Sequence, residues 1–366
     1  MKVGVLGGGQ LGRMLALAGI PMGFGFRFLD PDGAAPAGHV GELHVGSYED
    51  RAALSNFATG LDVATFEFEN VPAKSVLALG GYVLVYPGLV ALDQLQDRLS
   101  EKTLIRSLGI PTAEFVPLNS AGDLRSLTGL VGLPAVVKTR RFGYDGKDQW
   151  VVRSEEECEA IARHLPASPD TLILEGFVDF EREVSLIAAR GRRGEMAFYP
   201  LAENLHLGGI LRRSIAPAPG ATAALQQTAE RYARQIAEEL EYVGVLAVEL
   251  FERAGELLVN EVAPRVHNSG HWTIEGAETS QFENHLRAIS GLPLGSTAAR
   301  GVSAMWNVLG SPPAAESILE IPGAHLHLYG KAPRAGRKIG HVTVVSTDGS
   351  DLAERIERIA AAAPQT

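Results

Sequence analysis

Features that would indicate export or a membrane-spanning segment are scarce in this chain of 366 residues. Its single cysteine, Cys158, cannot form an internal disulfide, and the acidic run at 154–159 gives that thiol no electropositive setting that would activate it. Eighteen consecutive apolar residues occur nowhere, and glycines at 7–9 and 12 interrupt the apolar N-terminus. We therefore expect no export signal, no membrane partner and a location in the reducing cytoplasm.

An excess of positive charge is also missing. Lys and Arg number 33 against 43 Asp and Glu, which gives a formal net charge of −10. This balance argues against a nonspecific surface for nucleic acid or anionic lipid, so neither is expected as a partner. Aromatic residues make up only 7%, and a hydrophobic share of 46% is ordinary for a globular protein long enough for two or three domains. Any anion site must therefore be local.

Two apolar segments, 245–251 and 257–262, each carry one acid, Glu249 and Glu261. The midpoint between these two acids is Gly255, in the turn expected at 253–255, and a hairpin folded there would set the two carboxylates nearly opposite each other. Cross-strand Cβ atoms lie about 5 Å apart, and two anions on an apolar face repel unless a cation lies between them. Mg²⁺ is the natural cation, and it usually completes its shell with substrate phosphates, which indicates a nucleoside triphosphate. The alternative is that both acids point to solvent.

Residues 1–96 alternate short apolar strands with helices, which predicts a parallel sheet. The turn at 7–12 matches G-x-G-x-x-G between a strand and a helix, and Asp30 follows at the end of the second strand. This pattern is typical of dinucleotide binding, so a nicotinamide or flavin oxidoreductase is one interpretation. The same backbone amides would hold any phosphate monoester, and a third interpretation is that the glycines serve only close packing.

Lys138 ends the apolar segment 135–139 and precedes a basic loop with two glycines at 140–149. Such a loop is typical of a flap that closes over phosphates, although a solvated surface hairpin fits the same residues. It is not a Walker loop, because Asp148 stands where that motif requires Ser or Thr. The apolar segment 171–174 then leads into 175–178, whose backbone could pair with adenine.

The loop after the hairpin carries Arg265, His267 and Asn268, which supply donors suited to a small oxyanion such as bicarbonate. His267 alone would more often be a structural histidine. Basic residues gather again at 331–341, either as a solvated face or as a phosphate site.

Several longer motifs run through the chain, at 7–14, 65–72, 142–149, 260–265 and 267–276. With them the chain resembles the 5-(carboxyamino)imidazole ribonucleotide synthases, a family within the ATP-grasp superfamily. The resemblance implies an α/β and α+β fold, with a Rossmann-like N-terminal domain over 1–97, a central ATP-grasp domain over 98–292 and a small C-terminal domain over 293–366. It also implies an enzyme that uses ATP to activate bicarbonate as carboxyphosphate and then carboxylates the exocyclic amine of 5-aminoimidazole ribonucleotide.

The resemblance further assigns roles to individual residues of this sequence. It places magnesium on Glu249 and Glu261, and bicarbonate or carboxyphosphate on Arg265, His267 and Asn268. Asp145 would approach the amine, and the residues assigned to the ribonucleotide are Gly9, Gln10, Lys331 and Arg337. The residues assigned to ATP are Arg98, Lys138, Gly143, Tyr144, Gly146, Lys147, Asp148, Gln149, Glu175, Gly176, Phe177, Val178, Glu183, His206, Asn260 and Glu261.

By the same resemblance we expect a homodimer that passes its product to a mutase, which moves the carboxyl group to carbon. Two positions depart from the family pattern, Asp148 in place of a glycine and Val266 in place of a proline. Three other functions stay open at this point. They are an ATP-grasp ligase that activates formate for glycinamide ribonucleotide, a nicotinamide-dependent dehydrogenase, and a nucleotide-sensing module that releases no ADP.

Overall fold

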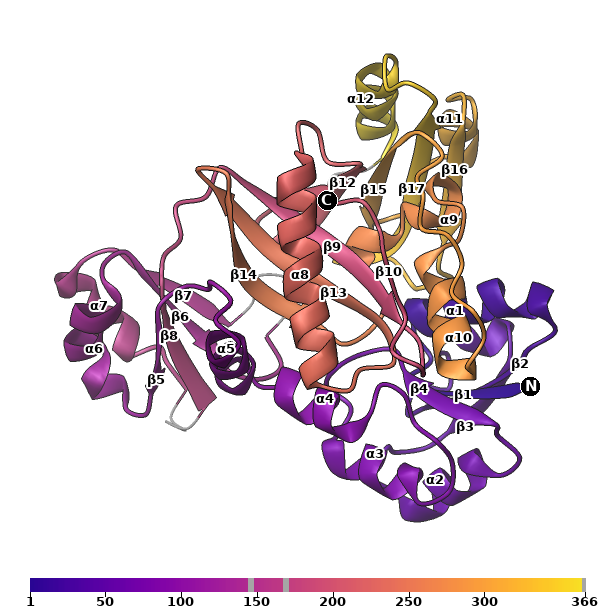
Figure 1. Ribbon diagram of the computed structural model, residues 1–366, viewed down its shortest axis with the longest axis horizontal. Coiled ribbons are helices and arrows are strands. Elements are labelled where there is room, and N and C mark those ends of the chain that lie inside the picture. Colours follow the sequence, from indigo (N-terminus) through magenta and orange to yellow (C-terminus); the bar gives the residue numbers. More distant parts are fainter. Residues whose placement is uncertain (144–147, 167–170, 364–366) are drawn as a thin grey trace.

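The computed structural model describes residues 1–143, 148–166 and 171–363, and the strands within these ranges form three sheets (Figure 1). The first sheet is parallel, with strand order β3-β2-β1-β4, as the alternating sequence predicts. Its strands are β1 (Lys2–Leu6), β2 (Gly25–Asp30), β3 (Glu42–Val45) and β4 (Val63–Phe66). The helices of this part are α1 (Gln10–Gly19), α2 (Arg51–Ala58), α3 (Ala73–Gly80) and α4 (Leu89–Leu95), with short 3₁₀ turns at Ile20–Met22 and Pro36–His39.

Helix α5 (Arg98–Ser107) begins the next part of the chain. The Asp97 side chain accepts hydrogen bonds from the backbone of Leu99 and Ser100, which satisfies free N–H groups of the first turn. The helix ends before Gly109, whose φ of 70° lies in the left-handed region that glycine adopts readily.

The second sheet is small and antiparallel, with order β5-β8-β6-β7. Its elements are β5 (Phe115–Leu118), β6 (Ala135–Thr139), β7 (Gln149–Val152), β8 (Leu172–Gly176), α6 (Leu124–Val131) and α7 (Glu155–Ala162), with a 3₁₀ turn at Ala121–Asp123. The two helices cover one face of this sheet, and their contact buries Cys158 beside Val137 and Leu174. Cys158 is a free, buried thiol.

The third sheet is the largest, with order β14-β13-β9-β11-β12-β15-β17-β16 and β10 beside β9. Its strands are β9 (Arg182–Arg190), β10 (Met196–Phe198), β11 (Ala202–Leu207), β12 (Ile210–Ala216), β13 (Gly244–Arg253), β14 (Glu256–Ala263), β15 (Val302–Gly310), β16 (Ala324–Leu328) and β17 (Arg334–Ser346). The helices here are α8 (Ala223–Glu239), α9 (Thr273–Gly276), α10 (Gln281–Ser290), α11 (Ala315–Leu319) and α12 (Leu352–Ala362), with a 3₁₀ turn at Asn268–Gly270.

The C-terminal strands continue this third sheet, because β15 pairs with β12 from Arg213↔Trp306 to Ala216↔Ser303. Helix α8 crosses the sheet near β9 and β14, and α10 lies beside α1 of the N-terminal part (Figure 1). His285 on α10 connects the two parts, since its Nε2 lies 2.9 Å from Thr65 Oγ1 and its Nδ1 accepts a hydrogen bond from Val245 N–H. The predicted mixture of α/β and α+β architecture is confirmed. The proposed boundaries after residues 97 and 292 stay a prediction.

Within the described ranges, no helix combines the length and the apolar character needed to cross a bilayer.

Candidate active site

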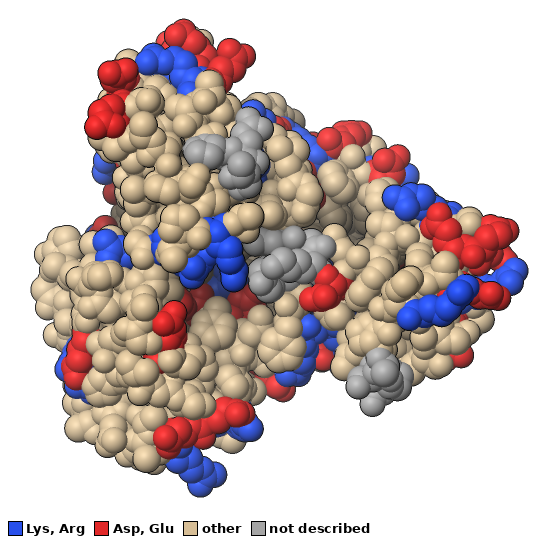
Figure 2. All heavy atoms as spheres, turned by 180° about the vertical axis from the view of Figure 1, so that it is seen from behind, with Lys and Arg blue, Asp and Glu red and all other residues tan. Residues whose placement is uncertain are grey.

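A cleft with a cavity of about 850 Å³ opens between the three sheets. Figure 2 shows the molecule hollowed between its lobes, with basic and acidic side chains gathered around the opening. Apart from Gly9, every predicted site residue that the structure describes lines this cleft. They are Gln10, Arg98, Lys138, Gly143, Asp148, Gln149, Glu175, Gly176, Phe177, Val178, Glu183, His206, Glu249, Asn260, Glu261, Arg265, His267, Asn268, Lys331 and Arg337. The predicted Tyr144, Asp145, Gly146 and Lys147 lie outside the described residues.

Glu249 on β13 and Glu261 on β14 pair directly across the hairpin, as their spacing predicts. The turn is shorter than the expected three residues. Ala254 and Gly255 alone form it, with φ angles of 52° and 77°, as in a type I′ turn. A two-residue turn on its own would set Glu249 opposite Asn260. A bulge after Glu249 shifts the register by one residue and brings Glu261 into that place.

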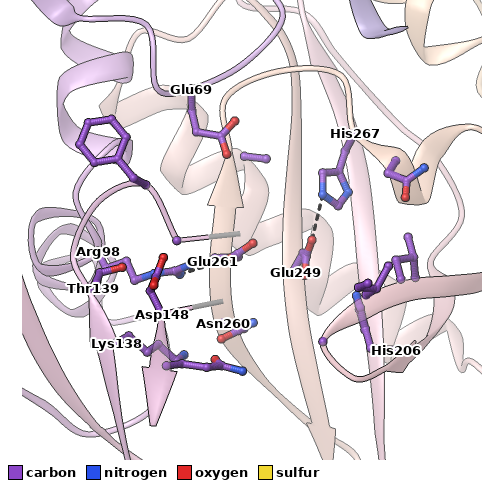
Figure 3. Close-up of a pocket in the computed structure, with 18 of the residues that line it drawn as sticks. Glu69, Arg98, Lys138, Thr139, Asp148, His206, Glu249, Asn260, Glu261 and His267 are labelled. Atoms are coloured by element: carbon purple, nitrogen blue, oxygen red, sulfur yellow. Dashed lines mark hydrogen bonds and ion pairs between the residues drawn. The ribbon is translucent and has the colours of Figure 1, made fainter. Parts of the chain in front are cut away.

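The bulge leaves Asn260 without a cross-strand partner, because Leu250 already pairs with Val259. Consecutive residues of a regular strand point to opposite faces, but at the bulge Asn260 and Glu261 both line the cleft (Figure 3). The Asn260 Oδ1 atom is buried and has no hydrogen-bond partner within the described residues. The bulge in β14 therefore places the Asn260 amide and the Glu261 carboxylate in the same cleft as Glu249.

Protein donors already contact both carboxylates. Arg98 Nη1 lies 2.7 Å from Glu261 Oε2, and His267 Nε2 lies 3.0 Å from Glu249 Oε1 (Figure 3). Burial alone would raise the pKa of Glu261, but Arg98 outweighs it and lowers the pKa to about 2. Glu261 is therefore ionised at neutral pH and able to accept a metal.

These oxygens fit a hard divalent cation such as Mg²⁺, which prefers carboxylate and carbonyl ligands. Among the residues that the structure describes, no three His, Cys, Asp or Glu side chains form a ready metal cage. Ligands beyond Glu249, Glu261 and Asn260 would therefore have to come from phosphates or water. The unpartnered Asn260 oxygen is the observation that supports this fit.

A second charged group surrounds Glu175 at the end of β8. Lys138 Nζ lies 2.9 Å from Glu175 Oε2, and Lys102 Nζ lies 3.4 Å from the same oxygen. Burial would raise the pKa of Glu175, but Lys138 and Lys102 outweigh it and lower the pKa to about 2. The resemblance assigns both Lys138 and Glu175 to ATP, and in this structure the two side chains contact each other.

Lys102 is a site residue that the sequence reasoning missed. It is fully buried, and its Nζ also donates to the backbone oxygen of Asn260 at 3.0 Å and to Thr112 Oγ1 at 3.1 Å. The spacing in the sequence could have indicated Lys102 as a site residue, because it lies four residues after Arg98 and therefore on the same face of the helix. The Lys102 side chain therefore contacts both the backbone of Asn260 at the bulge and the carboxylate of Glu175.

Glu183 on β9 and His206 on β11, both assigned to ATP by the resemblance, form an ion pair with each other. A register shift between Leu205 and His206 marks another irregularity at this point. Burial would lower the pKa of His206, but Glu183 and Glu249 outweigh it and raise the pKa. The rings of Phe180 and Phe251 stack 4.5 Å apart and line the same cleft, which gives a flat apolar surface that the sequence did not reveal.

Arg265 and Asn268 already have protein partners. Arg265 donates from Nε and Nη2 to both carboxylate oxygens of Glu69, a forked contact that uses the donors expected to face an oxyanion. The Asn268 and Asn307 amides exchange hydrogen bonds of 3.0 and 2.6 Å. The sequence could not show these partners, because Glu69 lies 196 residues from Arg265.

The glycine turn at 7–12 is occupied by the protein's own carboxylates. Gly9 N–H and Gly12 N–H both donate to Glu67, and Gly8 N–H donates to Asp30 Oδ2 at 2.7 Å. A dinucleotide pyrophosphate would meet these acids, so the structure argues against the dinucleotide interpretation. Burial raises the pKa of Glu67, although the two amides oppose that effect.

The substrate residues predicted from opposite ends of the chain come together beside this turn. Lys331 Nζ donates to Gln10 Oε1, and Arg337 lines the same part of the cleft. Burial lowers the pKa of Lys331 to about 8, with Arg337 adding to the effect and Glu67 opposing it. The structure thus joins the N-terminal turn to the basic C-terminal loop.

The two departures from the family pattern have simple structural settings. Asp148 has a φ of 55°, in the left-handed region where glycine is most at ease and Asp is tolerated. Val266 is buried in the core beside Val245 and Trp272, so an apolar side chain replaces the proline without opening a polar gap.

Three family models together span most of the chain. They describe a ribonucleotide synthetase preATP-grasp domain over residues 1–96, an ATP-grasp domain over 103–282 and a phosphoribosylaminoimidazole carboxylase C-terminal domain over 303–355. The cleft, the paired acids and these matches define the class as an ATP-grasp ligase.

Similar proteins narrow the class to one family. The N5-carboxyaminoimidazole ribonucleotide synthase of Pseudomonas aeruginosa is 51% identical over 361 residues, covering 99% of each chain, and that of Vibrio cholerae is 42% identical, covering 98% of this chain and 95% of the relative. The crystal structure of the Thermus thermophilus enzyme is also similar, with a TM-score of 0.95, 56% identity and coverage of 100% of this chain and 99% of that one. A structure from Aspergillus clavatus in complex with ADP and 5-aminoimidazole ribonucleotide has a TM-score of 0.90, 33% identity and 98% coverage of both chains. The chain belongs to the N5-carboxyaminoimidazole ribonucleotide synthase family, as its motifs predict.

Proposed function

We propose that this protein carboxylates 5-aminoimidazole ribonucleotide with bicarbonate at the expense of ATP, giving 5-(carboxyamino)imidazole ribonucleotide, ADP and phosphate. The observation that carries the proposal is the Glu249 and Glu261 pair, set directly opposite each other in a cleft that also holds Lys138 and Lys331. The relative from Aspergillus clavatus bound both ADP and the ribonucleotide, which supports the same pair of ligands here.

In the first step, an oxygen of bicarbonate attacks the γ-phosphorus of ATP, a new P–O bond forms, and the bond to the β-phosphate oxygen breaks to release ADP. Lys138 and Arg98 line the cleft where the phosphates would lie, and their charges offset the charge of the polyphosphate. Glu249, Glu261 and Asn260 would hold magnesium. When bound, magnesium supplies charge neutralisation at the phosphate oxygens.

In the second step, the exocyclic amine attacks the carboxyl carbon of carboxyphosphate, and the C–O bond to phosphate breaks. Arg265, His267 and Asn268 would orient the oxyanion, with His267 already beside Glu249. Asp145, which we propose accepts the amine proton, lies outside the described residues. Lys331, Gln10 and Arg337 would bind the ribonucleotide phosphate.

A coupled ADP assay tests this function. ADP release should require bicarbonate, should rise with 5-aminoimidazole ribonucleotide, and should be lost in Glu261→Gln. The matched control is Glu256→Gln on the same strand, where the side chain is exposed. Release that depends on formate and glycinamide ribonucleotide instead would support the other ligase, and thermal protection by NADH without any effect of ATP would support a dehydrogenase. ATP binding without ADP release would support a sensing module.

We further propose that the protein is a cytoplasmic homodimer and that a mutase consumes its labile product. Sedimentation velocity at micromolar concentration measures the assembly directly, and a monomer there would contradict this part of the proposal.

A further inference from the structure

The imidazole of His267 is held at both nitrogens. Its Nε2 lies 3.0 Å from Glu249 Oε1, and its Nδ1 lies 2.9 Å from Ser269 Oγ. An ionised carboxylate can only accept, so Nε2 carries a proton and donates it to Glu249. The backbone N–H of Ser269 donates to Nδ1 at 3.3 Å, so Nδ1 is the acceptor. These partners select the neutral tautomer with the proton on Nε2.

The hydroxyl of Ser269 is oriented by a chain of buried hydrogen bonds. Ser214 Oγ donates to Asn204 Oδ1 at 2.7 Å, Asn204 Nδ2 donates to Ser185 Oγ at 2.9 Å, and Ser185 Oγ donates to Ser269 Oγ at 2.8 Å. A hydroxyl has a single proton, and Ser269 receives one from Ser185, so its own proton can be donated to His267 Nδ1. All four residues of the chain are buried, which excludes competing water.

A different residue holds the backbone at this point. The Gln281 side chain accepts from His267 N–H at 2.9 Å and donates to the His267 carbonyl oxygen at 2.6 Å. Gly270 leaves room for that amide, since a Cβ there would lie 2.6 Å from Gln281 Oε1. Gln281 therefore places the loop, while Ser269 governs the ring.

We propose that Ser269 is a positioning residue for the reaction: its hydroxyl fixes the tautomer and the ring orientation of His267, so that Nε2–H faces Glu249 and the bicarbonate end of the cleft. This inference rests on the proposed function, in which His267 contacts bicarbonate or carboxyphosphate. Groups that orient a site residue from behind typically contribute about 10- to 100-fold to activity.

Steady-state kinetics of Ser269→Ala provide the first test. We expect kcat/KM for bicarbonate to fall about 10- to 100-fold, with KM for ATP within about twofold of the wild-type value. The control is Ser303→Ala, a buried serine of β15 whose hydroxyl has no partner within the described residues; it should behave as wild type. Ser269→Ala should have no further effect when His267 is already alanine, because its action passes through the ring. Additive losses, or an equal loss in the Ser303→Ala control, would overturn the proposal.

The second test does not depend on turnover. In protein labelled with ¹⁵N-histidine, the His267 signals, assigned by their absence in His267→Ala, should show the proton on Nε2. Ser269→Ala should give a mixture of tautomers, and an unchanged tautomer would refute the positioning role. If the wild-type protein released no ADP in the presence of bicarbonate, the proposed function would be refuted. The tautomer measurement would still decide whether Ser269 orients His267.

Discussion

Glu175→Gln probes the charged group at the base of the cleft. The Glu175 carboxylate is 3% exposed and lies 2.9 Å from Lys138 and 3.4 Å from Lys102. These lysines lower its pKa from the usual 4.5 to about 2. A change of that size corresponds to about 3 kcal/mol, because each tenfold change in proton affinity is worth about 1.4 kcal/mol.

The sign of the pH dependence follows from the direction of the shift. Because folding lowers the pKa of Glu175, its ionised form stabilises the folded state above about pH 4.5, and this contribution is lost as the pH falls from 4.5 toward 2. At pH 7 the glutamine variant should therefore lose about 3 kcal/mol of free energy of unfolding. The gap to the wild type should shrink as the solution is acidified through this window.

Urea unfolding followed by tryptophan fluorescence at pH 7, 5 and 3.5 measures this gap. The control is Glu114→Gln, because the Glu114 side chain is 74% exposed although it also contacts an arginine; it should change stability by less than about 0.5 kcal/mol. A Glu175→Gln variant that is as stable as the wild type at pH 7, or a gap that does not change with pH, would refute the reasoning.

Three further predictions follow from the same geometry. The Lys331 ammonium should deprotonate near pH 8, so kcat/KM for the ribonucleotide should fall above that pH in a pH–rate profile, and Lys331→Arg should remove the fall. Gly9→Ala would place a Cβ 2.5 Å from Glu67 Oε1, so KM for the ribonucleotide should rise while KM for ATP stays within about twofold of the wild-type value; equal changes in both would contradict this. Gly255→Val introduces a branched side chain at a φ of 77° and should cost about 1–2 kcal/mol in urea unfolding, and an unaltered midpoint would count against the two-residue turn.

The sequence was most informative where chemistry depends on neighbours along the chain. The parallel N-terminal sheet and the facing carboxylates of Glu249 and Glu261 both follow from local spacing. The pairing was predicted with a longer turn, and the actual two-residue turn gives the same register only because of the bulge at Asn260. A bulge leaves little trace in sequence periodicity, so its position required the structure.

Contacts between distant segments were the part that sequence could not provide. The glycine turn resembles a dinucleotide site until Glu67, 58 residues from Gly9, is seen to occupy its amides. In the same way, the sequence suggested that Arg265 is free to bind an oxyanion, but in the structure both carboxylate oxygens of Glu69 accept hydrogen bonds from its guanidinium group. Only the fold brings such partners together, because their separation along the chain carries no information about distance.

Magnesium binding to the nucleotide complex tests the central claim most directly. In calorimetric titrations of Mg²⁺ into protein saturated with a nonhydrolysable ATP analogue, Glu249→Gln and Glu261→Gln should each weaken Mg²⁺ binding at least about tenfold, because each removes one of two carboxylate ligands. Glu256→Gln should bind Mg²⁺ like the wild type. Wild-type affinity in both cleft variants would show that the facing carboxylates do not hold the metal, and would contradict the account.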